Sequence, residues 1–121
     1  MRFYYNGNLI RTSKTHHYTH ALLNSRGRAV MCSAKRSACE SFKQSNINHC
    51  LQAIENGKSA IKALEAKRRG YWCKKGRKTE WHSFSEWGVH SKAEYEEFIA
   101  QMERNIQVYQ SWQIVEIEER D

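Results

Sequence analysis

A basic and aromatic segment, residues 66–81 (AKRRGYWCKKGRKTEW), holds the side chains of this sequence best suited to binding a ligand. It carries seven lysines and arginines before its first acid, and three large rings lie among them. Arginine and lysine bind phosphates, whereas nucleobases stack on aromatic faces. We therefore expect a phosphorylated nucleotide or a single nucleic-acid strand to bind here. The candidate binding residues are Arg68, Arg69, Tyr71, Trp72, Lys74, Arg77 and Trp81, with Arg11 and Lys14 as further cations if the sheet brings them near.

The same segment has a plainer interpretation, in which it is a solvated hairpin whose tryptophans belong to the core. Catalytic motifs give no competing explanation, because the sequence contains no GxSxG, HExxH, Walker or GxGxxG pattern. Cys73 is the one candidate nucleophile, and packing of a strand explains it equally well. Adjacent carboxylates at 96–97 and 118–119 diverge on a helix or a strand and make poor acid–base pairs. We expect no catalytic activity and no cofactor.

Three histidines near the N-terminus, in the stretch THHYTH, suggest a zinc site at first sight. The stretch falls in an expected strand, where His17 and His20 point to opposite faces. His16 and His20 share a face but lie about 13 Å apart at about 3.3 Å per residue. Neither pair reaches a single ion, so we expect no metal and interpret the histidines as hydrogen-bonding or phosphate-contacting groups.

Charge is distributed unevenly along the 121 residues. Residues 1–78 carry seventeen lysines and arginines against three glutamates, a net charge of +14, whereas residues 79–121 carry three against ten acids, a net charge of −7. The basic part would attract phosphates, and the acidic part could dock on the basic part of a neighbouring copy. We therefore expect a homo-oligomer; solvated faces that only confer solubility are the alternative.

Length and composition predict a single globular domain over residues 1–121, with 40% hydrophobic residues and no apolar run long enough for a membrane span. The opening residues turn polar too early for a secretory signal. We therefore expect four reduced cysteines and a cytoplasmic location.

Local patterns predict antiparallel strands first. Asn6-Gly7 is typical of a type I′ turn in a hairpin over residues 2–12. Strands are expected at 15–23 and 28–33, joined by a turn at 25–27. A second hairpin is expected over 71–84, with Trp72 and Lys74 on one face and Tyr71, Cys73 and Lys75 on the other. A closing strand is expected over 112–118.

Helices are expected in three places. A capping box at Ser37 starts a helix that Asn56-Gly57 should end, and a second helix fits 59–69. A capping box at Ser91 starts a third helix, whose apolar stripe consists of Tyr95, Phe98, Ile99, Met102 and Ile106. The predicted fold is α+β, an antiparallel sheet built from hairpins with two or three helices packed on one face.

The opening FYYNGNLIRTS and the following KTHHYTH resemble the start of short proteins carried by phages and mobile elements of Gram-positive bacteria. With the size and the sheet-plus-helix plan, this resembles the Thoeris anti-defence sponge family. That resemblance implies a non-catalytic oligomer that sequesters a cyclic ADP-ribose-like or cyclic oligonucleotide immune signal. If a phage encodes the chain, the expected cytoplasmic location is the cytoplasm of the host. No binding residue is carried over from the family. A small single-stranded DNA- or RNA-binding protein, or an inhibitor of a host defence nuclease, is the alternative.

Overall fold

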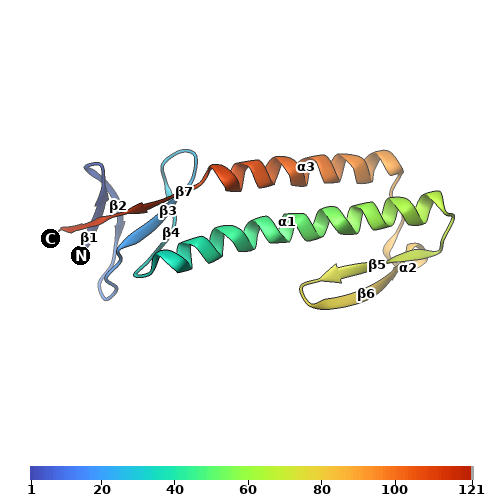
Figure 1. Cartoon of the computed structure of the whole chain (residues 1–121), viewed down its shortest axis with the longest axis horizontal. Helices are drawn as coiled ribbons and strands as arrows, with labels where there is room; N and C mark the ends of the chain where they lie inside the picture. The colour runs from blue at the N-terminus through green and yellow to red at the C-terminus, as the bar shows by residue number, and fades with distance from the viewer. Residues whose placement is uncertain (121) are drawn as a thin grey trace. The chain divides into compact units, whose positions relative to one another are not determined.

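The computed structural model describes residues 1–120 and confirms the α+β class. Its strands are all antiparallel, but they form three small sheets where the sequence predicted one. The elements are β1 (Arg2–Tyr5), β2 (Asn8–Thr12), β3 (His20–Leu23), β4 (Ala29–Ser33), α1 (Arg36–Glu65), β5 (Gly70–Lys75), β6 (Lys78–Ser83), α2 (Phe84–Trp87), α3 (Lys92–Ser111), β7 (Gln113–Glu116) and β8 (Glu118–Arg120) (Figure 1).

The contacts of the chain divide it into two compact units. Residues 1–47 and 107–121 make up the first, here called the terminal unit, and residues 48–106 make up the second, here called the hairpin unit. Both α1 and α3 contribute residues to each unit. The single domain expected over residues 1–121 stays a prediction.

The terminal unit contains two three-stranded sheets, ordered β2-β1-β8 and β4-β3-β7. Positive φ angles at Asn6 (49°) and Gly7 (78°) confirm the expected turn between β1 and β2. The strand expected from residue 15 begins only at His20, and the closing strand is divided into β7 and β8, which pair with different sheets. The apolar core of this unit is built on Ala21, Leu23 and Val115.

In the hairpin unit, α1 runs through the expected stop at Asn56-Gly57, so the prediction of two helices was wrong. The sequence pattern predicted that Gly57 ends the helix, whereas in the structure Gly57 lies inside α1 where α1 packs against α3. A Cβ at Gly57 would lie 2.9 Å from Cγ1 of Ile99 on α3, closer than side chains normally approach. The absence of a side chain therefore lets the two helices pack closely at this point.

The helix α1 ends instead in a Schellman motif. Lys67 takes the left-handed conformation at φ 53°, the amide of Arg68 donates to the carbonyl of Ala63, and that of Lys67 donates to Leu64. The chain then enters β5 at Gly70, where a Cβ would collide with backbone atoms of His82 and Ser83. These local constraints fix where the basic segment leaves the helix.

The start of α3 confirms the second capping box. Ser91 Oγ accepts the amide of Glu94 at 3.2 Å, and Glu94 Oε1 accepts the amide of Ser91 at 3.3 Å. Lys92 at the same end pairs with Glu65 at 2.8 Å, next to the end of α1. Among residues 1–120, no helix is long and apolar enough to cross a membrane.

Candidate functional site

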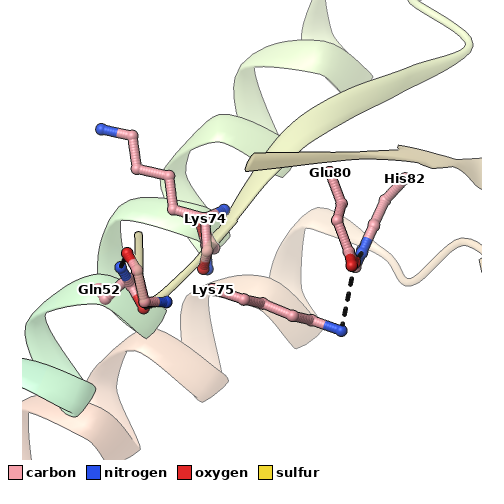
Figure 2. Close-up of polar contacts among 7 residues, drawn as sticks. Gln52, Lys74, Lys75, Glu80 and His82 are labelled. Atoms are coloured by element: carbon pink, nitrogen blue, oxygen red, sulfur yellow. Dashed lines mark hydrogen bonds and ion pairs between the residues drawn. The ribbon is translucent and has the colours of Figure 1, made fainter. Parts of the chain in front are cut away.

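Two amide side chains of α1 hold the hairpin β5–β6. Asn56 donates to the carbonyl of Lys74 and accepts its amide, both at 2.8 Å. Gln52 makes the same pair of hydrogen bonds to the carbonyl and amide of Gly76, both at 2.9 Å. Figure 2 shows Gln52 beside the end of β5, close to Lys74. Side chains of α1, and not a third strand, thereby make the hydrogen bonds of the backbone groups at the open edge of β5.

The spacing of these contacts follows from the rise per residue of a helix and of a strand. Four residues of helix rise about 6.0 Å and two residues of strand about 6.6 Å, so amides at i and i+4 meet alternate strand residues. An isolated two-stranded hairpin is marginally stable. The four hydrogen bonds from α1 therefore position the hairpin and every side chain on it.

The register of the hairpin gives it two different faces. Trp72 lies directly opposite Trp81, and Lys74 is opposite Thr79 on the same face. The two indoles pack edge to face, with ring centroids 5.3 Å apart. Such a pair stabilises a hairpin by about 0.5–1.5 kcal/mol. Both rings are nevertheless open to solvent, with Trp72 61% and Trp81 45% exposed.

Two adjoining hollows lie between this face and α1. The first, of about 230 Å³, is lined by both indoles and by Arg68, Lys62 and Tyr71, among others. The second, of about 290 Å³, is lined by Trp72, by Lys58, Lys62 and Lys74, and by one acid, Glu55, among others. They share Ser59, Lys62 and Trp72, so they form one continuous surface, here called the indole groove.

The indole groove is basic. Lys58, Lys62 and Arg68 have no ion-pair partner among residues 1–120, and only Lys74 is paired, with Glu55 at 3.7 Å. Cations on an exposed surface are free to exchange water for an anionic ligand, and an exposed pair such as Lys74–Glu55 costs little to break. The groove therefore combines ring faces with cations on one side of the hairpin.

The predicted binding residues are divided by the structure. Four of them, Arg68, Tyr71, Trp72 and Trp81, line the first hollow, and Lys74 joins Trp72 in the second. Arg69 and Arg77 line neither hollow. Arg11 and Lys14 belong to the terminal unit, whereas the others belong to the hairpin unit. The binding role of all nine stays a prediction.

Lys58 and Lys62 were missed by the sequence reasoning. Their spacing of i and i+4 places them on one face of a helix. The signal was hidden because Gly57 was taken as the end of the first helix. A single helix through Gly57 would have placed both lysines on one face, and the structure shows that both line the second hollow.

The opposite face of the hairpin is packed and paired. His82 is buried, stacks on Trp87 with centroids 4.4 Å apart, and lies 3.4 Å from Glu80. Lys75 pairs with Glu80 at 3.5 Å (Figure 2). The hydrogen bond from His82, followed by the charge of Lys75, lowers the pKa of the Glu80 carboxyl. These groups hold one another and do not line the indole groove.

The thiols are poorly suited to nucleophilic attack. Burial raises the pKa of Cys73, and the same cause comes first for the other three cysteines, all free thiols. A thiol with a raised pKa holds little thiolate at neutral pH.

The histidines of the THHYTH stretch have hydrogen-bonding partners. Nδ1 of His17 lies 3.1 Å from Glu119, and His16 and His20 each contact the threonine before them. His16 and His17 precede β3 and are not on a strand, which corrects the expectation for this stretch. Among residues 1–120 no group of three histidine, cysteine or acidic side chains is placed to hold a metal ion.

Comparison with known proteins adds no relative. No protein-family model, curated protein or solved structure matches this chain.

Proposed function

We propose that the chain is a non-catalytic binding protein for a phosphorylated nucleotide, which it holds in the indole groove. The observation that carries the proposal is the exposed Trp72–Trp81 pair beside four cations, three of which have no ion-pair partner within residues 1–120. Stacking of a base on an aromatic side chain contributes about 1–3 kcal/mol. Lysine and arginine supply the complementary contacts to phosphate.

The exposure of the indoles favours binding over a purely structural role. Exposing a large apolar ring to water is unfavourable in free energy. A tryptophan pair that served only to stabilise the hairpin would do so equally well if another part of the chain covered it. Trp72 also forms part of the wall shared by the two hollows, so a ring stacked on it lies within reach of cations on both sides.

The affinity of paired variants tests this arrangement. Lys62, which lines both hollows, is changed to Gln, and Arg77, on the turn outside both, is changed to Gln as the charge-matched control. Loss of one phosphate contact should weaken binding of ADP about tenfold for Lys62→Gln and less than twofold for Arg77→Gln. Equal effects of the two changes would reduce the site to general electrostatic attraction and contradict the proposal.

A single-stranded nucleic acid is the second candidate, because the two hollows are continuous and a strand can pass from one to the other. Its signature is a linear fall of log K against log salt with a slope near −0.7 per phosphate contacted. This candidate is favoured if an oligonucleotide binds much more tightly than ADP. In Lys62→Gln the salt slope for that oligonucleotide should become less steep by about 0.7, the value of one phosphate contact.

The biological form proposed for nucleotide binding is sequestration of an immune signal by a phage-type counter-defence protein, as the resemblance of the N-terminal stretch implies. Purified protein is incubated with signal mixtures from defence-active cells, washed and heated, and the released nucleotides are identified by mass spectrometry. Release of a specific nucleotide by the wild type and not by Trp72→Leu supports the role. No release above an unrelated control protein contradicts it.

A further inference from the structure

A separate cavity of about 430 Å³ lies in the hairpin unit, on the far side of β5 from the indole pair. Its walls come from α1 and β5, from the first two turns of α3 and from His90, two residues before α3. This volume is within the range of about 300–1,000 Å³ typical of small-molecule sites. The lining residues are Ala53, Asn56, Gly57, Tyr71, Cys73, His90, Glu94, Tyr95 and Phe98.

The lining is aromatic and carries one carboxylate. Tyr71, Tyr95 and Phe98 supply three rings, and no lysine or arginine lines the cavity. A carboxyl is ordinarily ionised at neutral pH, and the amide of Ser91, followed by His90, lowers the pKa of Glu94 further. The Ser91 amide donates to Oε1 of Glu94, and His90 lies 3.2 Å from Oε2. The faces of aromatic rings and a carboxylate both attract a cation.

We infer that this cavity binds a small organic cation with a methylated ammonium group, such as choline. The polar side chains of Asn56, His90 and Glu94 in the wall already make hydrogen bonds within the protein. An ammonium that carries N–H groups would therefore lose much of its hydration without full compensation. A methylated ammonium is apolar on its surface and cationic overall, so it satisfies both the ring faces and Glu94. The cavity shares Tyr71 and Asn56 with the walls of the indole groove, but neither indole and none of the groove's cations line it. The inference therefore does not depend on nucleotide binding.

The direct test compares choline with 3,3-dimethylbutan-1-ol, the neutral molecule of the same shape, by calorimetry or by NMR titration at pH 8 and low salt. Choline should bind on the order of tenfold more tightly, since cation–π attraction to several rings and one carboxylate acts only on the charged ligand. Equal affinities for choline and the neutral alcohol would show that the cavity does not recognise the positive charge, and would overturn the inference. The absence of choline binding at millimolar concentration would overturn it as well.

Matched variants assign the effect to named side chains. Phe98 is 44% exposed and lines the cavity, whereas Phe42 is 41% exposed and lies outside it. Phe98→Leu should weaken choline binding about fivefold, Phe98→Tyr should retain it, and Phe42→Leu should leave it unchanged. Glu94→Gln keeps a capping side chain for α3 but removes the charge, so it should also weaken binding of choline and not of the neutral isostere. The assignment fails if Phe98→Leu and Phe42→Leu weaken choline binding equally, or if Glu94→Gln has no effect on choline binding.

Discussion

Changing Asn56 to Ala removes both hydrogen bonds by which the middle of α1 holds Lys74 on β5, each 2.8 Å long. A protein hydrogen bond contributes a net 0.5–1.5 kcal/mol, so the two amount to about 1–3 kcal/mol. Alanine recovers up to about 0.7 kcal/mol through its higher helix propensity. We therefore expect Asn56→Ala to lower the free energy of unfolding by about 1–2 kcal/mol.

The assay is urea unfolding followed by circular dichroism, together with hydrogen exchange of the Lys74 amide. That amide is protected in the wild type because it donates to Asn56 Oδ1, and it should exchange faster in the variant. Asn56→Asp keeps the acceptor but loses the donor to the Lys74 carbonyl, so it should be destabilising as well. Gln107→Ala, on an exposed part of α3, is the control and should change stability by less than about 0.5 kcal/mol. A loss below 0.5 kcal/mol with unchanged exchange at Lys74 would refute the reasoning.

Three further predictions use the same stability assays. Gly57→Leu should destabilise the protein by about 1–3 kcal/mol, because the added side chain meets Ile99 across the helix contact; an unchanged urea midpoint would argue against that packing. Lys67→Gly should raise stability by about 0.5–1 kcal/mol, since glycine adopts the left-handed conformation at φ 53° without strain; a loss of stability would contradict the assigned helix end. The pKa of Glu94 is lowered in the folded state, so its contribution is present above the unfolded pKa, near 4.5, and is lost as pH falls through the lower folded value. Glu94→Gln should flatten the dependence of stability on pH in this acid range, and an unchanged profile would exclude the carboxylate as its source.

The sequence predicted the elements whose signals are local. Asn6-Gly7 between two alternating strands, the second hairpin and the box formed by Ser91 and Glu94 each depend on residues a few positions apart, and all three are present. Alternation along β5 also placed Trp72 and Lys74 correctly on one face. The class of fold follows from these elements.

Features that depend on distant residues were not predictable in this way. The separation of β7 from β8 is decided by their partners β3 and β1, which are about a hundred residues away in the chain. The close contact that Gly57 allows is with Ile99, more than forty residues away in the chain, and the place of Lys58 and Lys62 depends on the continuity of α1 through Gly57. Arg69 and Arg77 were grouped with the site by proximity in sequence, but neither side chain lines the groove.

The most direct measurement of the central claim is the NMR spectrum of the four indole N–H groups during titration with ADP. Each signal is assigned by substituting one tryptophan at a time. The account predicts that the signals of Trp72 and Trp81 shift together and saturate at one affinity, while those of Trp87 and Trp112, which do not line the indole groove, stay in place. Movement of the Trp87 or Trp112 signal alone, or no movement of any indole signal at millimolar nucleotide, would contradict it.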